Sequence, residues 1–210
     1  MAILALGFIT GIIFYRKRHR KMLPVIILLM YAFVSQIGSV IGAVYFRNNI
    51  PNEHLSIFMF TMIWAWFFYL NIDEAPARRA IRWLAPALAV FFICNTLFLQ
   101  DLNTLPSNSM KLATLFNLVL GSYLFIRLLD LPGKQNVFQN PIFLVAVGLV
   151  WFHTISSFHF FLTGFMFKYK IYSSFVGYVH LFSNYVYYLI IFMAMFSLKK
   201  YNQNDGTVRQ

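Results

Sequence analysis

Seven apolar runs occupy most of this 210-residue chain and leave only short polar segments between them. The hydrocarbon core of a bilayer takes about 20 consecutive apolar residues per helix. A chain of this length that crosses the bilayer seven times has no room for a separate soluble catalytic domain. The sequence therefore predicts an all-α, polytopic membrane bundle of seven transmembrane helices, which acts within the bilayer or at its two faces.

The composition and charge also favour a membrane protein. The chain is 60% hydrophobic and only 11% charged, whereas soluble domains carry about 25% charged residues. A net charge of +11 would also suit nucleic acid. The basic residues lie in short loops beside apolar runs, however, where membrane topology accounts for them. We therefore expect the lipid bilayer as a partner and no nucleic acid.

Turn-forming segments rich in Asn, Pro and Gly separate the expected spans. The spans cover residues 2–15, 23–46, 55–72, 83–100, 110–129, 141–165 and 174–198. They make one transmembrane domain over residues 1–200. Residues 201–210 are a short polar tail, expected to be cytoplasmic and frayed.

The basic residues concentrate in alternate connections, and such residues favour the cytoplasmic side of short loops. The first two of these basic loops contain Arg16, Lys17, Arg18, Arg20, Lys21, Arg78, Arg79 and Arg82. This pattern predicts an N-terminus outside and a C-terminus in the cytoplasm. The charge follows the first apolar run instead of preceding it, which argues against a cleaved signal peptide.

Polar side chains within the spans are the main functional signal, because such groups are costly in lipid and tend to face the bundle interior. The candidates for a ligand pocket are His153, His159, His180, Asn184, Asn117, Asn95, Gln36 and Tyr187. Most of the polar residues within the spans fall in the outer half, with His153 and Asn184 near the midplane. The sequence therefore predicts a polar pocket that opens towards the outside.

Helical spacing organises the polar residues of the last two spans. At about 100° per residue, His153, Ser156 and His159 share one face of the sixth span. His180, Asn184 and Tyr187 form a narrow stripe on the seventh span. His159 and His180 lie at similar distances from the outer end of their spans, so the two polar faces are expected to meet.

The histidines allow three interpretations. Hydrogen bonding between helices is the simplest one, and a ligand-binding or sensing pocket is the second. In the third, His159 and His180 ligate a metal or haem, since haem can take two histidines from different helices. Zinc catalysis would require a third ligand and a general base, and no Asp or Glu lies within a predicted span. The cofactor, if there is one, stays unknown from the sequence.

Two further patterns have structural explanations. Gly38 and Gly42 form a small-xxx-small pair, which permits close helix approach; packing within the chain is favoured over a dimer interface. Asp73 and Glu74 lie near the basic residues at 78, 79 and 82, where solvated ion pairs are the default. A surface for a cytoplasmic protein or for acidic lipid headgroups is the alternative there.

No evident catalytic motif is present. The last span has no lysine for a retinal Schiff base, and the serines near His153 lack an acidic orienting residue. The leading hypothesis is a small-ligand sensor or binding module, or a membrane subunit of a larger assembly with a membrane or cytoplasmic protein partner. A metal- or haem-binding redox protein and a purely structural subunit are the alternatives.

Three segments carry a resemblance to a known group: Arg16-Lys17-Arg18 after the first span, residues 122–129 at the end of the fifth (SYLFIRLL), and residues 179–184 in the seventh (VHLFSN). On these segments the chain resembles small, uncharacterised bacterial membrane proteins with seven helices. The resemblance implies the fold and a location in the bacterial cytoplasmic (inner) membrane. It implies little about activity.

Overall fold

The computed structural model describes residues 2–14, 17–130, 137–170 and 174–207. All regular elements in these ranges are helices. The chain forms two compact units, Met1–Ala113 and Thr114–Gln210. Arg16, one of the predicted cytoplasmic basic residues, lies outside the described residues.

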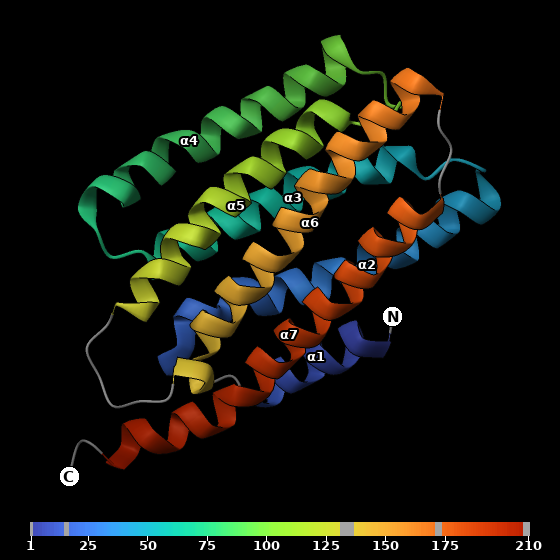
Figure 1. Ribbon diagram of the computed structural model, residues 1–210. Helices are drawn as coiled ribbons and strands as arrows, with labels where there is room; N and C mark the ends of the chain where they lie inside the picture. Colours follow the sequence, from blue (N-terminus) through green and yellow to red (C-terminus); the bar gives the residue numbers. More distant parts are fainter. Residues whose placement is uncertain (1, 15–16, 131–136, 171–173, 208–210) are drawn as a thin grey trace. The chain divides into compact units, whose positions relative to one another are not determined.

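In the first unit α1 packs on α2, α2 on α3, and α3 on α4. Its elements are α1 (Ala2–Phe14), the 3₁₀ helix η1 (Lys17–Met22), α2 (Leu23–Tyr45), α3 (Ile50–Asn71), α4 (Ala75–Cys94), the π-helical η2 (Asn95–Leu99) and the start of α5 (Ser107–Leu129). Its core contains Phe67 and Phe68 of α3, which are fully buried. Figure 1 shows α2 and α3 as an antiparallel pair.

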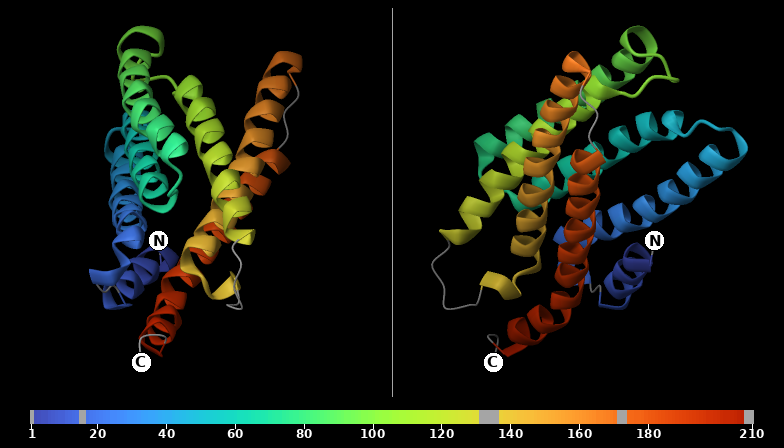
Figure 2. Two further views of the ribbon diagram at one scale, coloured as in Figure 1. Left: turned by 90° about the vertical axis from the view of Figure 1, so that its left-hand side faces the viewer. Right: turned by 45° about the vertical axis from the view of Figure 1, so that its right-hand side comes forward.

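The second unit contains the rest of α5 and the last two long helices. Its further elements are η3 (Val137–Gln139), α6 (Pro141–Tyr169) and α7 (Ser174–Thr207). α6 and α7 run antiparallel and make the most extensive helix contact in the described chain (Figure 2). Val145 and Leu149 of α6 and Ile191 of α7 are fully buried.

Proline marks the start of several helices. α2, α3 and α4 each have a proline in their first turn, and α6 begins at Pro141. A proline is well placed there because its missing N–H would have no helical partner in that turn. The turn between α2 and α3 uses a positive φ of 53° at Arg47, and the Gly42 carbonyl accepts bonds from the amides of Phe46 and Asn48, both at 3.1 Å.

Six helices of the described chain are long and apolar enough to cross a bilayer, which indicates an integral membrane protein. α1 has 13 residues. At about 1.5 Å per residue it covers about 20 Å, less than the roughly 30 Å of a hydrocarbon core. The first of the seven predicted spans is therefore present as a helix but is shorter than a standard crossing.

Several boundaries differ from the sequence prediction, and those of α3, α4 and α7 matter most. α3 begins at Ile50 instead of residue 55, and so it includes Glu53 and His54. α4 begins at Ala75 instead of residue 83, because the segment with the arginines continues the helix that Pro76 starts. α7 continues to Thr207, so the polar tail is helical in its described part.

Candidate functional site

The pairing of α6 and α7 is defined by two ring contacts. Phe152 stacks on Tyr187 with centroids 4.9 Å apart, and His159 stacks on His180 with centroids 4.4 Å apart. Each pair is separated from the other by the same number of residues on both helices, which fixes an antiparallel register. Gly148 contributes to the close approach, since a Cβ there would lie 3.3 Å from Cγ2 of Ile190.

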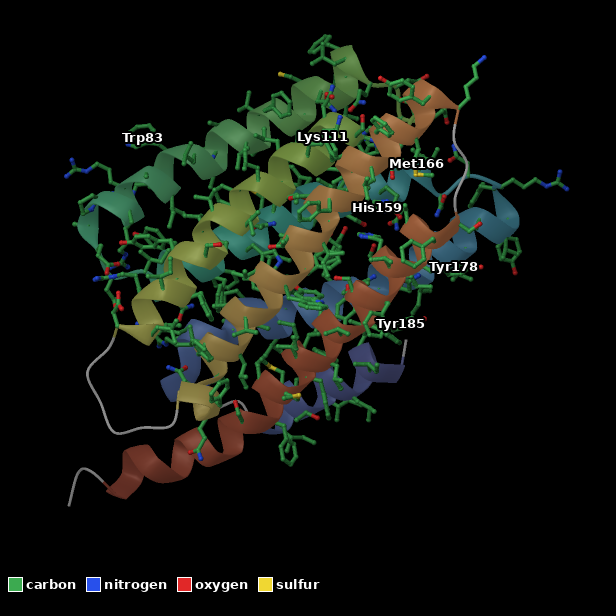
Figure 3. The ribbon with its side chains drawn as sticks, viewed as in Figure 1. Trp83, Lys111, His159, Met166, Tyr178 and Tyr185 are labelled. Atoms are coloured by element: carbon green, nitrogen blue, oxygen red, sulfur yellow. The ribbon has the colours of Figure 1, made fainter. Side chains whose placement is uncertain are left out.

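The histidine pair shows that the two predicted polar faces meet. The planes of the two rings differ by only 22°. Nδ1 of His159 lies 3.3 Å from the carbonyl oxygen of Val176 and donates to it, because a carbonyl oxygen only accepts. The His180 ring is half-buried and also contacts Phe152 and Phe160, with centroids at 5.7 and 6.4 Å. Figure 3 shows His159 on the side of α6 that is next to α7.

Two buried serines lie between these ring pairs. Ser156 is one helical turn beyond Phe152, and Ser183 is one turn before Tyr187, so the register places them at the same level. Both are almost completely buried. Neither hydroxyl has a hydrogen-bond partner among the described residues. The adjacent Ser157 differs, because its hydroxyl donates to the carbonyl of His153 at 2.8 Å.

Buried polar atoms without a partner are concentrated in the second unit. Seven such side-chain atoms occur in the described chain, of which only Tyr31 Oη and Asn71 Oδ1 belong to the first unit. The other five are Asn117 Oδ1, His153 Nδ1, Ser156 Oγ, His180 Nδ1 and Ser183 Oγ. Buried polar groups are normally hydrogen-bonded, so this concentration distinguishes the second unit.

Asn117 on α5 joins the same level of the unit. A Cβ on Gly121 would lie 3.3 Å from Cβ of Leu149, which marks where α5 crosses α6. Asn117 is one turn before Gly121 and His153 is one turn after Leu149, so both lie one turn to the same side of this crossing. We call Asn117, His153, Ser156, His159, His180 and Ser183 the polar seam.

The other predicted pocket residues have varied surroundings. Tyr187 is buried against Phe152, and its ring also contacts Tyr188 at 5.0 Å. Asn184 is half-buried on α7. Gln36 and Asn95 belong to the first unit, where Gln36 is exposed on α2. That these residues share a ligand pocket stays a prediction.

Asn95 has its hydrogen-bonding groups occupied within the first unit. It is fully buried at the start of the π-helical turn η2. Its Nδ2 donates to Gln100 Oε1 at 2.9 Å and to Ser109 Oγ at 3.0 Å. Its Oδ1 accepts from Nδ2 of Asn108 at 3.3 Å. These hydrogen bonds connect the end of α4 to the start of α5, and they favour a structural role for Asn95.

His54 is a buried residue of the first unit that the sequence reasoning missed. Its Nδ1 lies 2.9 Å from Oγ1 of Thr96, and its Nε2 lies 2.9 Å from the carbonyl oxygen of Thr104. Because a carbonyl oxygen only accepts, Nε2 donates to Thr104, and Nδ1 shares a hydrogen bond with the Thr96 hydroxyl. The sequence signal for His54 was the proline at residue 51. A proline there starts α3 before His54, so that His54 belongs to the helix.

Gly38 faces α3 within the chain, and Gly42 faces the turn that precedes α3. A Cβ on Gly38 would lie 3.3 Å from Oδ1 of Asn52, and one on Gly42 would lie 3.0 Å from the carbonyl oxygen of Asn48. Nearby, Nδ2 of Asn52 donates to Oγ of Ser39 at 2.7 Å. The glycines thus have a packing role inside the first unit.

The predicted basic loops gather at one end of the first unit. Lys21 precedes the last residue of η1 and forms an ion pair with Asp73 at 3.5 Å, and its carbonyl accepts from Nδ2 of Asn71 at 3.1 Å. The three arginines at 78, 79 and 82 lie in the first turns of α4 instead of a loop. Arg20, Lys17 and Arg18 belong to η1.

No group of three or more His, Cys, Asp or Glu side chains in the described ranges is arranged to hold a metal ion. His159 and His180 stack face to face, whereas two imidazoles that bind one ion direct in-plane lone pairs at it. One or both rings would therefore need to rotate before they ligated a common ion. Comparison of the chain with protein-family models, curated proteins and solved structures finds no match.

Proposed function

We propose that this integral membrane protein is a binding or sensing module for a small polar organic molecule, which binds at the polar seam of the second unit. The observation that carries the proposal is the set of five buried, unpartnered polar atoms on α5, α6 and α7. They fall within two helical turns along α6, between the levels of His153 and His159.

The energetic argument starts from the cost of such atoms. A buried donor or acceptor without a partner costs about 1–3 kcal/mol. Five of them within two helical turns are a large cost for one unit, whereas a ligand that supplies the missing hydrogen bonds would recover part of it. The polar seam therefore favours a ligand-bound state, in which these atoms are hydrogen-bonded, over the ligand-free state.

The side chains also indicate the chemistry of the ligand. Serine hydroxyls and neutral imidazoles both donate and accept, and the Asn117 oxygen accepts. Phe152 and Tyr187 add aromatic faces beside the seam. We expect a small, uncharged molecule with a planar or aromatic part and at least two hydrogen-bonding groups, because the described seam contains no carboxylate or ammonium group.

The proposal is tested by thermal unfolding of the detergent-purified protein against a panel of uncharged aromatic amides and alcohols. At least one compound is expected to raise the melting temperature, and His159→Ala and His180→Ala are each expected to abolish that rise. An unchanged rise in both variants would exclude the seam as the binding site. No rise with any compound of this class would contradict the proposed ligand chemistry.

A matched pair of serines controls for general damage to α6. Ser156→Ala removes an unpartnered hydroxyl of the seam, whereas Ser157→Ala removes a hydroxyl that is bonded to its own helix. Ser156→Ala is expected to weaken ligand binding, and Ser157→Ala is expected to leave it unchanged.

The proposal includes a topology and a location. We propose that α1 also crosses the bilayer, which gives seven spans in all. The protein would lie in a bacterial inner membrane, with its N-terminus outside and its C-terminus in the cytoplasm. The concentration of Lys and Arg at the end of the first unit that holds η1 and the start of α4 supports this orientation. The ligand would then enter from the outer side.

The contact between His159 and His180 keeps metal or haem binding as a second candidate. Their centroids are 4.4 Å apart, so rotation of the rings would bring two nitrogens within reach of one ion. An absorption spectrum and a metal analysis of the purified protein test this candidate, and a colourless, metal-free, folded sample would contradict it. Co-purification of a stoichiometric protein would instead favour a membrane subunit of an assembly.

A further inference from the structure

Two guanidinium groups gather on one phenol ring where α3 ends and α4 begins. The Cζ atom of Arg78 lies 4.8 Å from the ring centroid of Tyr69, and that of Arg82 lies 5.8 Å from it. Nη2 of Arg82 also donates to the Tyr69 hydroxyl oxygen at 3.1 Å. The two arginines are one turn apart on α4, so their charges are held on the same side of the helix.

These charges are not neutralised by the described part of the chain. Neither guanidinium has a carboxylate within ion-pair distance there, and the ion pair that is described at this end joins Lys21 to Asp73. The ring face attracts each cation, but it does not cancel the repulsion between two like charges. An anion that contacts both groups would remove that repulsion.

The surface next to the arginines is suited to lipid. Trp83 directly follows Arg82 and is 72% exposed, and Leu84 is exposed beside it. Figure 3 shows Trp83 on the side of α4 that points away from the other helices of the first unit. Tryptophan is enriched where hydrocarbon meets headgroups. The guanidiniums therefore lie at the depth of the headgroups, with an apolar helix face running from them into the hydrocarbon.

We propose that Arg78, Arg82 and Tyr69 bind the headgroup phosphate of an anionic phospholipid, whose acyl chains lie along Trp83 and Leu84. The planar fork of an arginine matches phosphate oxygens, and charge-assisted hydrogen bonds of this kind are strong. The Tyr69 hydroxyl accepts from Arg82 and keeps its own proton for a phosphate oxygen. This site is in the first unit and does not depend on the ligand of the polar seam.

The test is isothermal titration of the detergent-purified full chain with short-chain phosphatidylglycerol. Short-chain phosphatidylcholine and inorganic phosphate are the comparison ligands. The basic residues of a membrane surface each contribute about fivefold to affinity for anionic lipid. Arg78→Gln with Arg82→Gln is therefore expected to weaken phosphatidylglycerol binding by about 25-fold.

Arg79→Gln is the matched control, because it removes the same charge from an exposed position of the same turn. It is expected to change the affinity by no more than about twofold, since it removes only a long-range attraction that salt already screens. Arg78→Lys with Arg82→Lys keeps the charge without the fork and is expected to give an intermediate loss. This variant keeps the test valid if the glutamine pair fails to fold.

Three results would overturn the proposal. Equal affinities for phosphatidylcholine and phosphatidylglycerol would show that the headgroup charge is not recognised. An Arg79→Gln loss as large as that of the double variant would show that only net charge matters. Inorganic phosphate binding as tightly as the lipid would indicate a soluble-anion site instead of a lipid site.

Discussion

The imidazole rings of His159 and His180 stack across the α6–α7 interface with centroids 4.4 Å apart and planes within 22° of parallel. Phe152 and Phe160 flank the His180 ring. Parallel rings at this distance attract each other when both are neutral, whereas two imidazolium rings would repel. The contact is thus a packing feature that a charge on both rings would oppose.

The first prediction concerns ring shape and charge at His180. His180→Phe keeps an aromatic ring in the stack and is expected to change the free energy of unfolding by less than about 1 kcal/mol. His180→Lys places a fixed charge beside Phe152 and Phe160 and is expected to cost about 2–3 kcal/mol. Thermal or denaturant unfolding in detergent measures both, and equal stabilities of the two variants would show that the pair does not require neutrality.

The second prediction concerns the unpartnered serines of the seam. In the ligand-free protein, Ser183→Ala removes a buried hydroxyl that has no partner among the described residues, so it is expected to be neutral or to stabilise by up to about 1 kcal/mol. Ser156→Ala is expected to behave in the same way. A loss of stability in either variant, measured by unfolding in the same detergent, would show that its hydroxyl is hydrogen-bonded.

The third prediction compares His54 with Gln36. His54→Ala removes two hydrogen bonds that connect α3 to η2 and to the loop before α5, and is expected to cost about 2–3 kcal/mol. Gln36→Ala changes an exposed side chain of α2 and is expected to change stability by less than about 0.5 kcal/mol. Hydrogen exchange should also rise at residues 95–105 in His54→Ala alone; similar exchange in both variants would refute the bridging role.

The helices were predictable because hydrocarbon requires long apolar runs and proline and asparagine interrupt them clearly. The antiparallel meeting of His159 and His180 also followed from spacing, since both lie a similar number of residues from the turn. α4 was predicted too short because Arg78, Arg79 and Arg82 suggest a solvated loop, whereas arginine is a good helix former. The charge marks where a helix leaves the hydrocarbon and not where the helix begins.

The hydrogen bonds were the part that spacing did not predict. Asn95 and Asn117 are both asparagines inside apolar runs, yet Asn95 is saturated by Gln100, Ser109 and Asn108, while Asn117 Oδ1 has no described partner. Their difference depends on which side chains the neighbouring loop supplies. That is a property of tertiary structure and has no counterpart in helical periodicity.

The fourth prediction distinguishes the two glycines of α2. A Cβ on Gly42 would meet the backbone of Asn48 at 3.0 Å, and the Gly42 carbonyl also accepts two amides of the turn. On Gly38 the nearest atom belongs to the side chain of Asn52, which has more freedom to move. Gly42→Ala is expected to cost about 1–3 kcal/mol and Gly38→Ala about 1 kcal/mol or less. The reverse order in unfolding experiments would contradict the packing role.

The fifth prediction concerns topology and uses single cysteines in a Cys94→Ser background. α3 and α4 are joined by a short connection before Ala75, whereas Leu102 lies in the loop between η2 and α5. Because α4 with η2 is long enough to cross a bilayer, these two positions are expected on opposite sides. With the basic end of the first unit in the cytoplasm, Leu102→Cys should react with a membrane-impermeant maleimide on intact cells, and Ala75→Cys only after permeabilisation.

Ala2→Cys in the same background then tests whether α1 crosses. α1 covers about 20 Å, so a crossing requires local thinning of the bilayer or snorkelling of a flanking arginine. In the proposed topology the basic residues that follow α1 keep its C-terminal end on the cytoplasmic side, and an apolar helix has its lowest free energy within the hydrocarbon. Ala2→Cys is therefore expected to react from outside, like Leu102→Cys. Reaction only after permeabilisation, like Ala75→Cys, would show that α1 turns back within the membrane and that the bundle has six crossings.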